Sequence, residues 1–199
     1  MGIGKLGIFG GTFDPPHLGH LIEAQFASEQ LGLEKLLFVP TGEHPLKSYP
    51  GMASATDRLE MTKIAIRDNP LFELSDLEVK REGKSYTINT IEHVKKMFEP
   101  SELFLLVGID NVEIFSKWHR IDEILDSCKV VVLSRLVDDD YVLSPTLIEK
   151  IKILDSPIIE TSSTEIRENI ADGFSIRYVV PDAVRDYIQK KSLYRVPTA

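Results

Sequence analysis

The sequence holds a single cysteine, Cys128, among 199 residues, and its 23 basic side chains are outnumbered by 31 acidic ones. One cysteine excludes an internal disulfide framework and a zinc module built from several cysteines. The formal net charge of −8 argues against nucleic acid as a partner, because nucleic-acid binding needs a basic surface. Cys128 directly precedes the apolar run 129–133, so we expect a buried structural thiol there.

Long hydrophobic stretches are also missing. The longest apolar run, residues 103–107, is far shorter than the ~20 residues that cross a bilayer. The start of the sequence, Met1 to Leu6, contains neither an apolar signal-peptide core nor the Ser or Thr that a myristoylation signal requires. We therefore expect a cytoplasmic protein without a membrane partner.

Strand-like apolar runs alternate with stretches of helical period over most of the chain. The predicted strands are 6–9, 36–39, 72–79, 103–107 and 130–133, and the predicted helices are 17–31, 57–68 (with Asp57 as N-cap) and 87–98. Continuous apolarity indicates strands that are covered on both faces, as in a parallel sheet. We expect one domain over 1–199: a doubly wound, Rossmann-like α/β core at 1–143 with helices on both faces, and a small, mostly helical part at 144–199.

The most informative stretch is Gly10-Gly11-Thr12-Phe13-Asp14-Pro15-Pro16-His17-Leu18-Gly19-His20. It follows the first strand, where open α/β sheets bind their ligands. The two glycines are interpreted as a tight turn that lets the backbone approach a ligand. His17 and His20 share one face at the start of a helix, where backbone N–H groups attract phosphate.

Three interpretations compete for these histidines. They could be ordinary core or surface residues. As zinc ligands they lack a partner cysteine and the H-E-x-x-H pattern of zinc hydrolases. As hydrogen-bond donors to phosphate they have a suitable location and neighbourhood, and we favour this third interpretation.

A second candidate phosphate site begins at Ser162-x-x-Glu165, a capping box. Capping leaves Arg167 unexplained, since a cation in the first helical turn opposes the helix dipole. A bound anion would resolve this conflict, with Ser163, Thr164 and Arg167 as donors. Two helix N-termini with polar donors would suit a triphosphate lying between them.

The G-G-T-F-D-P-x-H-x-G-H run resembles the signature of the nucleotidyltransferase superfamily, most closely that of the bacterial nicotinate-nucleotide adenylyltransferases. Further matching segments cover nearly the whole chain: Asp57-Arg58-Leu59-Glu60-Met61, Ser85-Tyr86-Thr87-Ile88-Asn89-Thr90, Val107-Gly108-Ile109-Asp110, Trp118-His119-Arg120, Ser162-Ser163-Thr164-Glu165-Ile166-Arg167 and Tyr178-Val179-Val180-Pro181. Leu46, before Lys47, replaces the histidine that the family usually carries.

The resemblance implies a role for each matching residue. ATP would be bound by Gly10, Gly11, Thr12, Phe13, His17, His20, Asp110, Ser163, Thr164 and Arg167. The acceptor nucleotide would be bound by Gly11, Phe13, Lys47, Thr87, Trp118 and His119, with the indole of Trp118 stacked on the pyridine ring. The catalytic groups would be His17, His20, Lys47 and Arg167, the histidines adding to a positive field. Mg²⁺ would be carried by the substrates, without a metal site of the protein itself.

The implied reaction is adenylyl transfer from ATP to nicotinate mononucleotide, giving nicotinate adenine dinucleotide and pyrophosphate, in NAD biosynthesis. Three alternatives stay open: a sister transferase acting on nicotinamide mononucleotide or phosphopantetheine, a non-catalytic nucleotide-binding module, and a histidine-based metal hydrolase. No oligomeric state follows from the residues.

Overall fold

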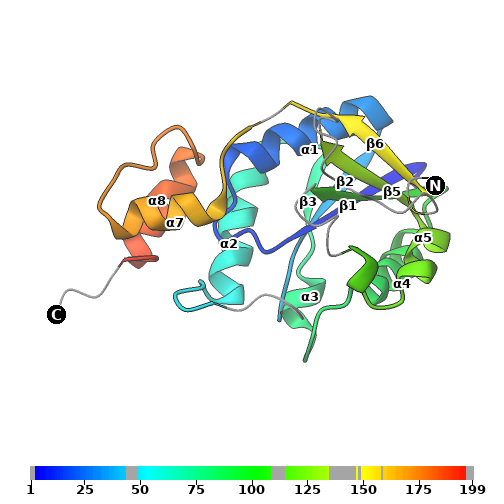
Figure 1. Cartoon of the computed structure of the whole chain (residues 1–199), viewed down its shortest axis with the longest axis horizontal. Helices are drawn as coiled ribbons and strands as arrows, with labels where there is room; N and C mark the ends of the chain where they lie inside the picture. The colour runs from blue at the N-terminus through cyan, green and yellow to red at the C-terminus, as the bar shows by residue number, and fades with distance from the viewer. Residues whose placement is uncertain are drawn as a thin grey trace.

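The computed structural model describes residues 3–43, 49–108, 115–134, 147, 149–157 and 159–195. Within them lies a six-stranded sheet whose paired strands all run parallel, in the order β3-β2-β1-β4-β5-β6 (Figure 1). The strands are β1 Lys5–Gly11, β2 Lys35–Pro40, β3 Phe72–Leu74, β4 Glu102–Gly108, β5 Lys129–Ser134 and β6 Ile151–Asp155. The order reverses between β1 and β4, and a crevice at the carboxyl ends of such strands is the usual ligand site. The predicted doubly wound α/β fold is confirmed.

Helices cover both faces of this sheet. Along β1, Leu6 and Ile8 belong to a buried cluster with α4 (Thr87–Phe98) and α5 (Ile121–Ser127), whereas Phe9 belongs to a cluster with α1 (Leu18–Leu31). This alternation follows from the two-residue period of a strand. Each large apolar side chain buried in this way contributes about 1.5–3 kcal/mol.

The last two helices form a third cluster beside the sheet. Helices α7 (Ser163–Ala171) and α8 (Asp182–Lys191) pack on α2 (Ala55–Ile66) through side chains that include Met61, Ile166, Val184 and Ile188. In Figure 1 these two helices lie next to α2, at the opposite end of the molecule from α4 and α5. Packing on α2 therefore positions the start of α7 beside the carboxyl end of β1.

The structure corrects three local predictions. Ser54 caps α2, and its Oγ accepts the N–H of Asp57 at 3.0 Å, so Asp57 lies inside the first turn instead of capping it. The predicted strand 72–79 ends at Leu74, and α3 (Leu77–Lys80) follows. The sequence also gave no prediction of strand β6, which begins the otherwise helical C-terminal part.

Cys128 is half-buried rather than fully buried. Its Sγ donates to the Ile124 carbonyl at 3.4 Å, and burial raises the pKa of the thiol to about 12. Since the thiolate is the reactive form, this side chain is structural. No helix among the described residues has both the length and the apolarity needed to cross a membrane.

Candidate active site

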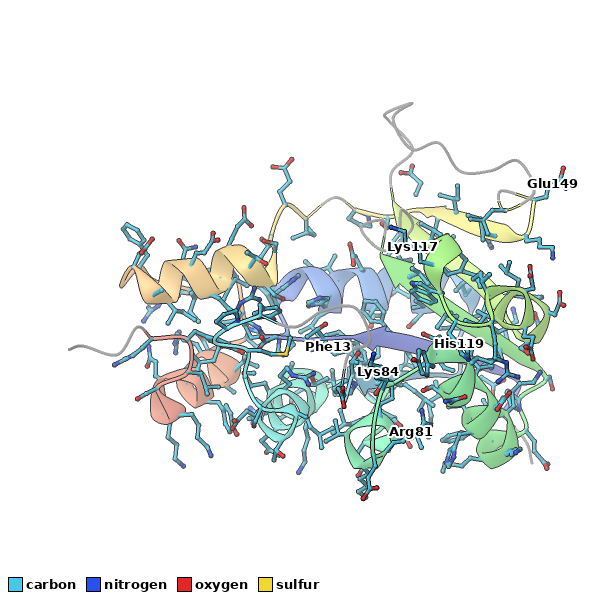
Figure 2. All side chains as sticks on the ribbon, turned by 60° about the horizontal axis from the view of Figure 1, so that its bottom comes forward. Phe13, Arg81, Lys84, Lys117, His119 and Glu149 are labelled. Carbon is cyan, nitrogen blue, oxygen red and sulfur yellow. The ribbon has the colours of Figure 1, made fainter. Side chains whose placement is uncertain are left out.

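A cavity of about 700 Å³ opens at the carboxyl ends of β1, β2 and β4. We call two parts of its wall the histidine end (Gly10–Asp14, His17, His20, Tyr49, Thr161–Thr164 and Arg167) and the tryptophan end (Ser85–Thr87 and Lys117–His119). In Figure 2, Phe13 lies beside the blue strand β1, whereas Lys117 and His119 come from the green segment before α5. The cavity thus brings both predicted helix N-termini and the predicted tryptophan site together.

The two histidines cap the start of α1 reciprocally. His17 is the N-cap, and its Nδ1 accepts the backbone N–H of His20 at 3.4 Å. His20 Nδ1 in turn accepts the backbone N–H of His17 at 3.2 Å. The two rings consequently stack, with centroids 3.6 Å apart. A Cβ on Gly19 would approach the His17 ring to 3.0 Å, so glycine gives that ring its room.

These hydrogen bonds determine how the rings are protonated. Each Nδ1 accepts a hydrogen bond, so the proton of each neutral ring is on Nε2. Burial lowers the pKa of His17 to about 4, against a smaller opposing effect of Glu165, and burial and the neighbouring His17 also lower the pKa of His20. Both rings are therefore uncharged at neutral pH. The expected contribution of the histidines to a positive field is wrong, because the rings are neutral and can act as Nε2–H donors.

The glycines after the first strand do not form the predicted turn. Gly10 and Gly11 continue β1, and the chain turns at Phe13, whose φ is 49°. Phe13 is 2% exposed, and its ring packs against Phe9 and His20, so the ring is not open to a ligand. A Cβ at Gly10 would meet no protein atom within 4 Å. Gly10 lines the cavity and thereby leaves open space at this part of its wall.

The start of α7 is bonded directly to the loop after β1. Ser163 Oγ donates to the Pro15 carbonyl at 2.9 Å, and Arg167 Nη1 donates to the Asp14 carbonyl at 2.8 Å. Arg167 Nη2 also contacts Thr164 Oγ1 at 3.1 Å. Because α7 begins at Ser163, Arg167 is its fifth residue and lies in the second turn, not in the first as predicted. Protein groups also satisfy part of the guanidinium, so a bound anion is not needed to explain this arginine.

The tryptophan end is built by packing. Trp118 is half-buried against Phe115, with ring centroids 4.8 Å apart, and His119 lies 4.6 Å from the ring of Tyr86. Tyr86 is the N-cap of α4, but it makes no side-chain capping hydrogen bond. Backbone N–H groups in the first turn of this helix, which begins at Thr87, thus lack a side-chain cap beside the cavity, and such groups suit an anion.

Comparisons with known proteins agree with this geometry. The family described as Cytidylyltransferase-like matches residues 8–169. A relative from Dehalococcoides mccartyi, named "Probable nicotinate-nucleotide adenylyltransferase", is 39% identical over 96% of this chain and 97% of its own length. A relative from Caldicellulosiruptor bescii with the same name is 39% identical over 96% of this chain and 99% of its own.

The chain belongs to the nicotinate-nucleotide adenylyltransferase family. Its fold also matches a solved structure of Plasmodium falciparum nicotinic acid mononucleotide adenylyltransferase complexed with NaAD, with a TM-score of 0.79 at 19% identity. That alignment covers 96% of this chain and 97% of the other. The predicted membership of an adenylyltransferase family is confirmed.

Two residues that the family resemblance singled out, Lys47 and Asp110, lie outside the described residues. So does Leu46, the departure from the family pattern. Their assignments stay predictions.

The family's signature motif contains a buried polar group that was not predicted from the sequence. The Asp14 carboxylate is 1% exposed and accepts hydrogen bonds from the Tyr49 hydroxyl, the Ala53 N–H and the Tyr194 hydroxyl. Arg58, also buried, donates to the backbone carbonyls of Thr12, Gly42 and Ala53. The sequence signals for this network were the acidic residue between Phe13 and Pro15 and the arginine of the matching segment 57–61.

A second group that was not predicted lines the cavity near the tryptophan end. The Glu78 carboxylate is buried, and Thr90 Oγ1 donates to its Oε1 at 2.6 Å. Burial raises the pKa of Glu78, against the lowering effect of its hydrogen bonds. Residues 72–79 were predicted as a strand, and that prediction gave no reason to expect a buried acid at position 78.

Proposed function

We propose that this chain transfers the adenylyl group of ATP to nicotinate mononucleotide, releasing pyrophosphate and forming nicotinate adenine dinucleotide. The observation that carries the proposal is the single cavity that joins the His17/His20 helix start, the α7 start and the Trp118 segment. Together with family membership over nearly the full length, this supports a site for two phosphate-bearing nucleotides.

In this reaction an oxygen of the acceptor's 5′-phosphate attacks the α-phosphorus of ATP, and the bond from that phosphorus to the β-phosphate oxygen breaks. No nucleophilic side chain is required, because the acceptor phosphate is already an anion at neutral pH. The protein must hold two polyanions in line and stabilise charge on the leaving pyrophosphate.

We assign the ATP phosphates to the histidine end. His17 and His20 would donate through their neutral Nε2–H groups, and Arg167 would supply the positive charge. Lys47 would be a further phosphate ligand and Asp110 a ribose ligand, both by family resemblance. Gly10 to Phe13 would line the path of the nucleotide with backbone.

We assign the acceptor to the tryptophan end. The indole of Trp118 would stack on the pyridine ring, which adds about 1 kcal/mol beyond the area buried. The uncapped N–H groups near Thr87, together with the backbone near His119, would bind the nicotinate carboxylate.

Mg²⁺ is the metal that the family implies. Among the residues that the structure describes, no group of three or more His, Cys, Asp or Glu side chains could hold a metal ion. Mg²⁺ is often held by substrate phosphates, waters and few protein ligands, which fits this donor set. When bound, it would neutralise phosphate charge.

We further propose that residues 1–199 act as one domain, in which 144–199 complete the site of 1–143. We also propose that the enzyme works in the cytoplasm, with ATP as a substrate.

The deciding experiment supplies the purified protein with ATP, Mg²⁺ and one of three acceptors: nicotinate mononucleotide, nicotinamide mononucleotide or phosphopantetheine. We expect pyrophosphate release to be fastest with nicotinate mononucleotide, and the dinucleotide product to be found by mass. A higher kcat/KM with phosphopantetheine would mean that the chain is a sister transferase that uses this acceptor. Binding of ATP without pyrophosphate release with any acceptor would make it a nucleotide-binding module.

A further inference from the structure

The buried carboxylate of Asp14 connects the end of the chain to the cavity. Tyr194, 180 residues after Asp14, donates its hydroxyl to Asp14 Oδ1 at 2.6 Å. The Ala53 N–H contacts the same oxygen at 3.2 Å, and Tyr49 donates to the other oxygen, Oδ2. A buried carboxylate needs such donors, because nothing else replaces its lost hydration.

Tyr194 is held in an unusual backbone conformation. Its φ is 64°, and Ser192, two residues earlier, has a φ of 52°. Side chains other than glycine rarely adopt this left-handed region, and they stay there only when surrounding contacts enforce it. The Tyr194 hydroxyl thus reaches Asp14, in the loop after β1, although the backbone conformation that this requires is locally unfavourable.

Asp14 holds Arg167 by two routes. Its backbone carbonyl accepts Arg167 Nη1 at 2.8 Å. Its carboxylate holds the Tyr49 hydroxyl, and the guanidinium of Arg167 lies 4.3 Å above the ring of Tyr49. Burial and the neighbouring carboxylate raise the pKa of both tyrosines, so both hydroxyls keep the protons that they donate. The orientation of the Asp14 carboxylate is therefore coupled to the position of Arg167.

We propose that Tyr194 is a positioning residue for adenylyl transfer, which acts through Asp14 and Tyr49 to fix the Arg167 guanidinium at the histidine end of the cavity. The inference rests on the proposed function, because the phosphate contact of Arg167 belongs to that function. Tyr194 itself does not line the cavity, so it touches no substrate there. Without its hydroxyl, Asp14 Oδ1 keeps only the longer hydrogen bond from the Ala53 N–H, and the buried carboxylate with its partners would rearrange.

Tyr187 offers a matched control. It lies in α8, and its hydroxyl donates to Asp57 Oδ1 at 2.9 Å, a carboxylate of α2 that does not line the cavity. Tyr187→Phe therefore removes one tyrosine–aspartate hydrogen bond from the same part of the molecule without touching Asp14. Comparing it with Tyr194→Phe separates loss of stability from loss of positioning.

The test is a double-mutant cycle in kcat on the wild type, Tyr194→Phe, Arg167→Ala and the double variant, measured well below the thermal midpoint of each. We expect Tyr194→Phe to lower kcat on the order of tenfold, with the KM for the acceptor within about twofold of wild type, and Tyr187→Phe to change neither. In the Arg167→Ala background, Tyr194→Phe should lower kcat by less than twofold, because the group it positions is gone. Wild-type kcat in Tyr194→Phe, or the same fold-loss in both backgrounds, would overturn the proposal.

The activity of the wild type distinguishes a failure of the proposed function from a failure of this proposal. If the wild type releases no pyrophosphate with any acceptor, the proposed function fails. The same four proteins are then compared by calorimetric affinity for ATP. Positioning of Arg167 predicts a loss of affinity from Tyr194→Phe that disappears in the Arg167→Ala background, and equal losses in both backgrounds would again overturn it.

Discussion

The histidine end and the tryptophan end of the cavity are held by different forces. At the histidine end, hydrogen bonds join segments that are distant in the sequence, as Ser163 to Pro15 and Tyr194 to Asp14. At the tryptophan end, rings pack on one another, and α4 begins without a side-chain cap. Donors that are fixed in advance suit the stabilisation of a transition state, whereas a surface of rings suits binding of one flat substrate. Changes at the first end should therefore act mainly on turnover, and changes at the second on acceptor affinity.

The largest effect is expected from His20→Ala at the histidine end. In the proposed reaction it removes an Nε2–H donor to the developing phosphate charge, and donors of this kind are worth roughly 10²–10³ in kcat. Pyrophosphate release at saturating ATP and acceptor measures the loss. His93→Ala, which removes an exposed histidine of α4, is the control and should retain full turnover. Near-normal kcat in His20→Ala would break the assignment of catalysis to this end.

Gly10→Val tests the same end by adding atoms instead of removing them. The new Cβ meets no protein atom within 4 Å, and valine favours strands, so the thermal midpoint should stay near that of wild type. The side chain would displace the nucleotide, and a misplacement of about 1 Å can cost 10²-fold in rate. We expect kcat/KM for ATP to fall by about that factor. A stable variant with unchanged kcat/KM would show that ATP does not pass this strand end.

Trp118→Ala probes the tryptophan end. Loss of stacking on the pyridine ring should raise the KM for nicotinate mononucleotide by about tenfold, from roughly 1 kcal/mol of stacking and some lost burial. The KM for ATP and the kcat should change little, and Trp118→Phe should recover part of the affinity. An unchanged KM for the acceptor in Trp118→Ala would mean that Trp118 only packs on Phe115 and does not bind the acceptor.

The regular parts of the fold could be predicted from the sequence because their signal is local. Strands β1, β2, β4 and β5 each contain a run of consecutive apolar residues, and α4 begins and ends where its helical period predicts. Strand β6 was missed because it is an edge strand, Ile151-Lys152-Ile153-Leu154-Asp155, in which charges interrupt the apolar residues. Strand β3, also at an edge, is three residues long. It ends before Ser75-Asp76, and Asp76 is the N-cap of α3, but Leu77 and Val79 continue a strand-like alternation beyond this stop signal.

The candidate site, like the fold, has parts that could be predicted from the sequence and parts that could not. The positions of His17, His20 and Arg167 follow from motifs, and the structure places all three in one cavity. The charge of the histidines does not follow from motifs, because it depends on burial by groups brought together in the fold. The partners of Asp14 were also out of reach, since Tyr49 and Tyr194 lie 35 and 180 residues away and no sequence spacing connects them.

The smallest effect expected is a pH dependence of stability that belongs to the histidine end. The pKa of His17 is about 4 in the folded chain and about 6.5 in an unfolded one. Between these values the unfolded chain binds more protons, so the free energy of unfolding falls as the pH drops below 6.5 and levels off below 4. From pH 7 to 5.5 we expect a loss of about 1 kcal/mol from this residue, measured by urea denaturation. His17→Asn keeps an N-cap acceptor but cannot titrate, so its stability should fall less over this range than that of the wild type. Because His20 titrates in the same direction, part of the slope should survive in His17→Asn, and an undiminished slope would mean that His17 is not the neutral cap described above.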